Sequence, residues 1–210
     1  MSRSEKFRDI AAHTRDIYER NAARFDAERV KSLIERKWLA RFCALLPAGG
    51  SVLDVGCGTG DPIARDFIER GYGVTGVDFS EAMLAVARAR CPDARWLCAD
   101  MRRLALGETF DGIVGWHSFF HLTPDEQAST LTKLAAHLAP GGALMLTVGP
   151  EAGEVTGHVG DEVVYHASLS RRDYELGLAA LGLRIVEFTV SDDDCGGATV
   201  LLARKQKKAA

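Results

Sequence analysis

The residues with the clearest chemical potential lie in the turn Gly56-Cys57-Gly58-Thr59-Gly60, which directly follows the apolar run Val52–Val55. Glycines at alternate positions let the backbone turn sharply, and without a Cβ atom a ligand can lie directly against the peptide N–H groups. Pro62 suits the first turn of a helix, where its missing N–H costs nothing. The pattern predicts a buried strand that ends in a ligand-binding turn; the alternative is an ordinary glycine-rich connection.

Aspartates stand at corresponding places around this turn. Asp54 precedes the glycines, Asp78 ends the apolar segment 73–77, and Asp100 follows the segment 94–98. In nucleotide-binding α/β folds, an acid about 20 residues beyond the glycines binds the ribose hydroxyls. Any one of these acids could be a solvated loop residue, but together they predict a single nucleoside site.

Composition resembles that of ordinary α/β proteins and limits the partners. The 210 residues carry a formal net charge of −3, which gives no general attraction toward nucleic acid or an anionic membrane. The five cysteines include no Cys-x-x-Cys pair, which is typical of reduced thiols in a cytoplasm. No apolar run is long enough to cross a bilayer, and no secretory signal is recognisable. We therefore expect a cytoplasmic protein that binds neither nucleic acid nor membrane.

Strand-like and helix-like segments alternate from Ser51 onward. Strands are expected at 51–55, 73–77, 94–98, 110–115 and 143–148, and helices between them at 60–70, 81–91 and 124–138. Such an order predicts a parallel sheet covered by helices, with ligands at the carboxyl ends of the strands. In the last third, a helix at 171–181 precedes strands at 183–190 and 198–204, which suggests a terminal antiparallel hairpin.

Two helices are expected before the first strand. Ile10, Ile17 and Tyr18 would share one face of the first helix, and a second helix is expected at 27–45. Because both precede the β-α-β winding, they must pack on its edge or over its ligand-binding rim. Tyr18 and Trp38 are candidate substrate contacts, with anchoring in the apolar core as the alternative.

The spacing Gly56-x-Gly58-x-Gly60 resembles motif I of the class I S-adenosylmethionine-dependent methyltransferases. The similarity continues in the family's order through Asp78, Asp100-Met101, Phe110–His117 and Leu138–Leu144. It covers roughly residues 51–148 together with the terminal hairpin. Several independent motifs in the right order make the resemblance specific.

This resemblance implies an α/β fold with a Rossmann-like, doubly wound sheet. The seven strands would lie in the order 3-2-1-4-5-7-6, with strand 7 antiparallel and helices on both faces. Residues 1–210 would form a single methyltransferase domain, made of N-terminal helices at the cofactor rim (1–47), a nucleotide-binding core (48–148), and a substrate loop, helix and terminal hairpin (149–210).

The resemblance also implies S-adenosylmethionine as cofactor and S-adenosylhomocysteine as product. Asp78 would bind the ribose, Asp100 and Met101 the adenine edge, and the amides of the glycine turn the methionine carboxylate. The expected cofactor-binding residues are Asp54, Gly56, Cys57, Gly58, Thr59, Gly60, Asp78, Phe79, Met83, Asp100, Met101, Arg102, Trp116 and His117. One alternative is a NAD-type oxidoreductase, although its fingerprint requires glycine where this chain has Asp61. A non-catalytic S-adenosylmethionine-binding module is another.

His117 is the candidate general base. It directly follows the strand expected at 110–115, at the point where a methyl group would be transferred. His121 follows in the same segment and would order the loop. As a metal pair these histidines lack the glutamate of His-Glu-x-x-His and a third ligand, so no metal is expected.

The acceptor is expected to bind beyond the strands at 110–115 and 143–148. The glycine-bearing segment 149–160 is predicted to be a loop that forms a lid or a wall. Candidate substrate-binding residues are Tyr18, Trp38, Phe120, His121, Tyr165 and His166. Gly115-Trp116-His117-Ser118 stands where the family has Asn/Asp-Pro-Pro-Tyr in enzymes that methylate DNA bases or protein glutamine. The predicted function is therefore methyl transfer to an O or N atom of a small molecule, by a monomer or homodimer.

Overall fold

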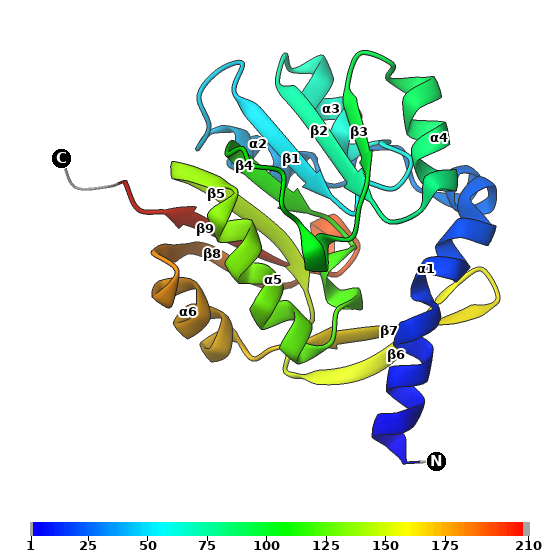
Figure 1. Ribbon diagram of the computed structural model, residues 1–210. Coiled ribbons are helices and arrows are strands. Elements are labelled where there is room, and N and C mark those ends of the chain that lie inside the picture. The colour runs from blue at the N-terminus through cyan, green and yellow to red at the C-terminus, as the bar shows by residue number, and fades with distance from the viewer. Residues whose placement is uncertain (1, 208–210) are drawn as a thin grey trace.

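The computed structural model describes residues 2–207 and has an α/β fold built on one large sheet (Figure 1). Its seven strands lie in the order β3-β2-β1-β4-β5-β9-β8. The strands are β1 (Ser51–Val55), β2 (Gly73–Asp78), β3 (Arg95–Cys98), β4 (Phe110–Gly115), β5 (Leu138–Val148), β8 (Leu183–Asp192) and β9 (Ala198–Lys205). Strands β1 to β5 pair in parallel, and β9 is antiparallel to β5 and β8. Apart from the numbering, which an extra hairpin shifts, this is the predicted order, and it is confirmed.

Helices cover both faces of the sheet, as predicted. The helices of one face are α2 (Arg36–Cys43), α3 (Ile63–Glu69) and α4 (Glu81–Arg90), and those of the other are α5 (Pro124–Ala136) and α6 (Arg171–Ala180). Figure 1 shows α5 and α6 in front of the sheet. Each set buries its apolar side chains against its own face, which forms two cores separated by the strands. This packing fixes the carboxyl ends of the parallel strands at one edge.

Several helices begin at side-chain caps that their sequences specify. The Ser80 hydroxyl accepts a hydrogen bond from the N–H of Met83 at the start of α4. Thr123 and Glu126 form a reciprocal capping box at the start of α5. Because each cap satisfies an N–H that the helix cannot, these helices start at defined residues. Short 3₁₀ turns occupy Met101–Arg103, Phe119–His121 and Asp193–Cys195.

The N-terminal region differs from the prediction. One long helix, α1 (Arg3–Glu28), is followed by residues 29–35 without helical structure, so the predicted helix at 27–45 is wrong in its first half. Arg29 leaves the helical conformation, and Leu33 has a φ of 54°. The apolar periodicity was misleading here because Val30 and Ile34 are exposed.

The segment after β5 is also different from the predicted loop. Residues 153–168 form a separate two-stranded antiparallel hairpin, β6 (Gly153–Val159) and β7 (Glu162–Ser168). Glycines at the start and middle of β6 hid the strand pattern, since glycine weakens strand propensity. The hairpin packs against α1, and Figure 1 shows the two lying side by side below the carboxyl ends of the parallel strands.

Two further boundaries are shifted. Helix α3 begins at Ile63 rather than at residue 60, and β5 begins at Leu138 rather than at residue 143. The added part of β5 pairs with β4 across a register irregularity between Phe110 and Gly112. Within residues 2–207, no helix combines the length and apolarity needed to cross a membrane.

Candidate active site

The glycine turn after β1 is fastened to the end of β2. Both the Gly56 and the Cys57 N–H donate to the carbonyl of Val77, at 2.7 and 3.1 Å. The Gly58 N–H donates to the carboxylate of Asp78 at 2.9 Å. A Cβ atom at Gly56 would lie only 2.2 Å from the Cβ of Ser118, so no larger residue fits there. The turn is therefore a rigid wall, fastened to β2 and packed against Ser118.

These hydrogen bonds correct one expectation about the turn. The amides of Gly56, Cys57 and Gly58 were expected to bind a ligand carboxylate, but the protein itself uses them. Arg29, which sequence analysis missed, lies at the same cavity as Asp54. Its guanidinium donates to the buried Glu35 carboxylate at 2.6 Å, which holds it in place. An arginine just beyond a helix has no distinguishing sequence signal, and only the fold brings it here.

The acids at the ends of β1 and β2 are buried and electrostatically coupled. Burial, and then the charge of Asp78, raises the pKa of Asp54 to about 8, while Arg29 opposes the rise. Burial raises the pKa of Asp78 to about 6, although its carboxylate accepts hydrogen bonds from the Ser80 and Gly58 N–H groups. A ligand that brings a cation to Asp54 and hydroxyl donors to Asp78 would stabilise both carboxylates.

Two adjoining cavities lie at the carboxyl ends of the strands. The inner cavity, lined by Asp54, Asp78 and Arg29 among others, has a volume of about 70 Å³. The rim cavity, lined by Asp100 and Arg102 among others, has a volume of about 300 Å³. The residues common to both are Phe79, Met101, Ser118 and His121. An elongated ligand could thus extend from one cavity into the other.

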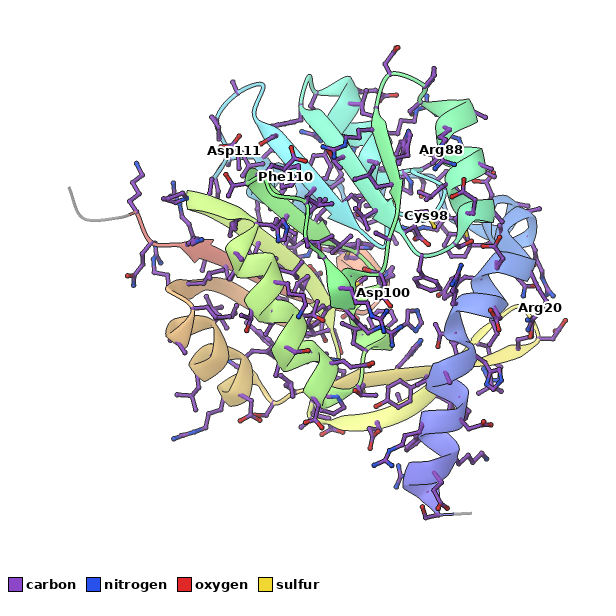
Figure 2. The ribbon with its side chains drawn as sticks, in the orientation of Figure 1. Arg20, Arg88, Cys98, Asp100, Phe110 and Asp111 are labelled. Atoms are coloured by element: carbon purple, nitrogen blue, oxygen red, sulfur yellow. The ribbon has the colours of Figure 1, made fainter. Side chains whose placement is uncertain are left out.

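Figure 2 labels residues at both ends of the parallel strands, and the cavities lie at only one of these ends. Cys98 and Asp100 lie at the carboxyl end of β3, whereas Phe110 and Asp111 lie at the opposite end, where β4 begins. The Asp111 carboxylate accepts hydrogen bonds from the N–H and hydroxyl of Ser51. Its role is therefore to join two strands, away from the cavities.

Most of the expected cofactor-binding residues meet at these cavities. The inner cavity is lined by Asp54, Gly56, Cys57, Gly58, Thr59, Asp78, Phe79, Met83, Met101, Trp116 and His117, and the rim cavity by Phe79, Asp100, Met101 and Arg102. Gly60 is the exception, and the expectation for it is corrected. Its α-carbon packs against Trp96, where an added Cβ would lie at 2.8 Å, so it serves close packing of the turn. Phe25, Ile63 and Ser118 line the inner cavity without having been predicted.

The residues present fit an adenosyl ligand with a charged amino-acid end. The indole N–H of Trp116 is buried at the inner cavity and has no hydrogen-bond partner within residues 2–207. A buried donor of this kind is normally satisfied, so it is available to a ligand. Arg29 could bind a carboxylate and Asp54 an ammonium, while Asp78 could accept from ribose hydroxyls. In the described part of the chain, no cluster of side chains is arranged to bind a metal ion.

His117 has an unusual backbone conformation and lines two cavities. Its φ of 53° is rare for a residue other than glycine, and its N–H donates to the Thr147 hydroxyl at 2.7 Å, which holds that conformation. It lines the inner cavity and also the outer cavity, a third space of about 600 Å³ beyond β5. Although part of its surface remains accessible, burial lowers the pKa of His117 to about 4, helped by Arg29 and His166. Its imidazole is therefore neutral near pH 7.

Tyr18 and His121 form the wall between α1 and the 3₁₀ turn after β4. A ring nitrogen of His121, Nδ1, lies 2.9 Å from the carbonyl of Tyr165 and must donate to it. The other nitrogen, Nε2, therefore accepts from the Tyr18 hydroxyl at 2.9 Å. Burial lowers the pKa of His121 to about 3, which is consistent with this neutral form. The pair orders the loop and joins α1 to the hairpin.

The other candidate substrate contacts are placed in two ways. Phe120 and His166 line the outer cavity, and their ring centroids lie 4.5 Å apart. Trp38 is instead fully buried in the core and donates its indole N–H to Asp192 at 2.8 Å. Tyr165 is also fully buried, and its hydroxyl donates to the Glu154 carboxylate. The predictions for Trp38 and Tyr165 as substrate contacts are therefore wrong, because packing rather than the cavity uses these rings.

Comparison with known proteins agrees with this geometry. Residues 52–142 match the family described as methyltransferase domain. The dTDP-3-amino-3,4,6-trideoxy-alpha-D-glucopyranose N,N-dimethyltransferase of Streptomyces venezuelae is 37% identical over 102 residues, which cover 48% of this chain and 43% of that protein. The trans-aconitate 2-methyltransferase of Delftia acidovorans is 33% identical over 162 residues, which cover 75% of this chain and 57% of that protein. The chain spans about half the length of these curated relatives.

The solved structures show the same fold. An amino pentose methyltransferase from Micromonospora echinaspora, solved with S-adenosylmethionine bound, has a TM-score of 0.71 at 24% identity; the match covers 89% of this chain and 96% of that chain. Strand order, the glycine turn with its acids, and the domain match together define the class. Residues 52–142 thus form a methyltransferase domain, and the chain has the fold of the class I S-adenosylmethionine-dependent methyltransferases. The NAD-type alternative is not supported.

Proposed function

We propose that this chain transfers a methyl group from S-adenosylmethionine to an O or N atom of a small-molecule acceptor. The observation that carries the proposal is the position of His117, which lines both the inner cavity beside Asp54 and Asp78 and the larger outer cavity. A donor in one space and an acceptor in the other would meet at this residue. Such alignment of two reactants is the main contribution that a protein makes to this type of reaction.

The relatives support this proposal in outline. Those compared above are named as an enzyme that dimethylates the amine of a nucleotide-linked sugar and as one that methylates trans-aconitate. Both acceptors are small molecules, but they differ in the atom that is methylated. The acceptor of this chain must therefore be argued from its own cavity.

The chain's own side chains have distinct proposed roles. When bound, S-adenosylmethionine supplies an electrophilic methyl group, and S-adenosylhomocysteine is the product. Asp78 holds the ribose, and Asp54 and Arg29 hold the ammonium and carboxylate of the methionine end. The neutral imidazole of His117 accepts the proton that the acceptor loses. Helix α1 and the hairpin β6–β7 cover the site and exclude water.

We also propose a domain organisation, a cellular compartment and an oligomeric state. Residues 1–210 would act as one domain, in the cytoplasm, as a monomer or homodimer that binds no nucleic acid. The five cysteines are all free, which supports a reducing compartment. Light scattering during size-exclusion chromatography measures the oligomeric state, and a tetramer would contradict the proposal.

The function is tested with two cofactors and a methyl label. Calorimetry should detect binding of S-adenosylmethionine and none of NAD. Incubation with methyl-labelled S-adenosylmethionine and a broad metabolite panel should then move the label to a small molecule. Binding of NAD alone would overturn the proposal, and cofactor binding without any label transfer would favour a non-catalytic binding module.

The role of His117 is tested by His117→Ala. Loss of a positioned base should lower the rate of label transfer by about 100-fold while cofactor affinity changes little. Rates are measured from pH 5 to 9 for both proteins, with His13→Ala, on the exposed surface of α1, as the control. An unchanged rate at every pH would show that alignment without a base is sufficient.

A further inference from the structure

The outer cavity carries more negative than positive charge where an acceptor would lie. Glu151 and Glu154 line it, and among the described residues Arg3 is the one lysine or arginine that does. His117 and His166 also line it, and burial lowers the pKa of both imidazoles, so they add no positive charge at neutral pH. The ionised side chains of this cavity therefore sum to −1.

The single cation is already engaged, whereas the carboxylates are not neutralised. The Arg3 guanidinium lies 5.3 Å from the centroid of the Phe7 ring and donates to the backbone carbonyl of Glu154 at 3.4 Å. The Glu154 carboxylate accepts from the neutral hydroxyl of Tyr165 at 2.6 Å. Within residues 2–207, neither Glu151 nor Glu154 forms an ion pair. Both acids can therefore attract a positively charged group.

The remaining wall of the outer cavity is largely apolar. Phe120, Val148, Pro150, Ala167 and Ala198 contribute side chains to it. At about 600 Å³, the cavity has the size of an ordinary small-molecule site. A compact apolar body with one polar group suits such a space.

A side cavity of about 300 Å³ also reaches His117 and is lined by cations, but these are paired. Arg24 donates to Glu28 at 2.7 Å and to Asp161 at 2.9 Å. Arg29 is held by Glu35. An anionic acceptor that entered here would have to compete with Glu28 and Asp161 for Arg24, and with the methionine carboxylate for Arg29, so it gains little from these arginines.

Resting on the proposed function, we propose that the acceptor is a small, largely apolar amine and not a polyanion such as a nucleoside diphosphate or a tricarboxylate. Polyanions require cationic or N–H donors that match each negative group, and the outer cavity lacks such a set. An ammonium binds beside the glutamates and loses one proton to solvent, which the imidazole of His117 relays without remaining protonated. The amine nitrogen then donates its lone pair to the methyl carbon, and the carbon–sulfur bond breaks with its electrons on sulfur. The alkylated ammonium then loses a proton to solvent.

The test compares three probes of one shape and different charge. The protein, saturated with S-adenosylhomocysteine, is titrated at low salt with 2-phenylethylamine, 2-phenylethanol and 3-phenylpropanoate, and separately with citrate and inorganic pyrophosphate. Ligand-observed NMR gives the dissociation constants. The amine should bind at least about tenfold more tightly than the carboxylate, and the double variant Glu151→Gln/Glu154→Gln should reduce this ratio below about threefold.

Glu175→Gln is the charge-matched control, since Glu175 pairs with Arg171 on the exposed surface of α6. It should leave the ratio unchanged. Equal or tighter binding of the carboxylate, citrate or pyrophosphate would overturn the inference, and so would equal binding, or no binding, of all probes. Failure to bind S-adenosylhomocysteine would instead contradict the proposed function, which keeps the two failures distinguishable.

Discussion

The sheet-side wall of the site and the cover opposite it are held in different ways. Around the glycine turn, backbone groups of neighbouring strands bond to one another, as when the Gly56 and Cys57 amides share the Val77 carbonyl. The cover, made of α1 and the hairpin β6–β7, is joined by side chains far apart in sequence, such as the Arg20–Glu162 pair at 2.5 Å. Figure 2 shows Arg20 on α1 beside the hairpin. The first wall should be rigid, and the second should open at a small energetic cost.

This difference between the rigid wall and the cover is consistent with the small volume of the inner cavity. At about 70 Å³ it is smaller than ordinary ligand sites, although it has the groups to bind one. Exposed polar pairs contribute little to stability and can reform after an opening. A ligand would therefore enter by displacing the cover rather than by deforming the sheet-side wall.

The largest effect is expected for Gly56→Ala in the rigid wall. The added Cβ would lie 2.2 Å from the Cβ of Ser118, and the φ of 74° is strained for alanine. We expect a loss of about 4 kcal/mol in the free energy of unfolding, measured with denaturant. Gly71→Ala is the control, since it has a φ of 84° but no atom within 4 Å of its Cβ, and should lose about 1 kcal/mol. Equal losses would mean that the wall yields as readily as a surface turn.

The next effect is expected for the ionisation of Asp54, which lies in the sheet-side wall. The pKa of Asp54 in the folded protein, about 8, is above its ordinary value of 3.8. Its contribution to stability is therefore fully present below about pH 4 and is lost as pH rises through about 8. Asp54→Asn cannot ionise, so at pH 9 the ligand-free variant should be more stable than the wild type, with little difference at pH 4. Unfolding curves from pH 4 to 9 measure this, and a wild-type stability that is flat with pH would contradict it.

A smaller effect is expected for Asp78→Ala. The variant loses the proposed ribose acceptor and the bond to the Gly58 amide. Calorimetry should show cofactor affinity weakened by about 2 kcal/mol, with the fold intact by circular dichroism. Asp111→Ala, at the other end of the sheet, should leave affinity unchanged. Unchanged affinity in the Asp78 variant would place the cofactor elsewhere.

The smallest effect is expected in the cover. Glu162→Gln breaks the ion pair with Arg20 and weakens the bond to Asn21. Because these groups are at least partly exposed, stability should fall by only about 0.5 kcal/mol. Hydrogen exchange should nevertheless become faster along β6 and β7, because the hairpin opens more often. A loss comparable to that of Gly56→Ala would remove the distinction between the two walls.

The contrast between the sheet-side wall and the cover also explains which parts of the site the sequence could predict and which it could not. The turn at Gly56, the acids Asp54 and Asp78, and the strand order were predictable because each has a local pattern and the parallel winding brings strand ends together. Arg29 was missed, and the break at residues 29–35 with it, because the buried partner Glu35 has no local signature. Strand β6 was taken for part of a loop because its glycines hide the strand pattern, and its pairing with β7 and the contacts of the hairpin with α1 have no local signature. Local rules thus predict the sheet-side wall, and long-range side-chain contacts determine the cover.

The most direct measurement is a crystal structure with S-adenosylhomocysteine bound. The account predicts that the ribose hydroxyls lie within hydrogen-bonding distance of the Asp78 carboxylate. The sulfur should lie at His117, facing the outer cavity, with the amino-acid end between Asp54 and Arg29. A ligand bound away from the carboxyl ends of β1 and β2, or one whose sulfur faces away from the outer cavity, would contradict the account.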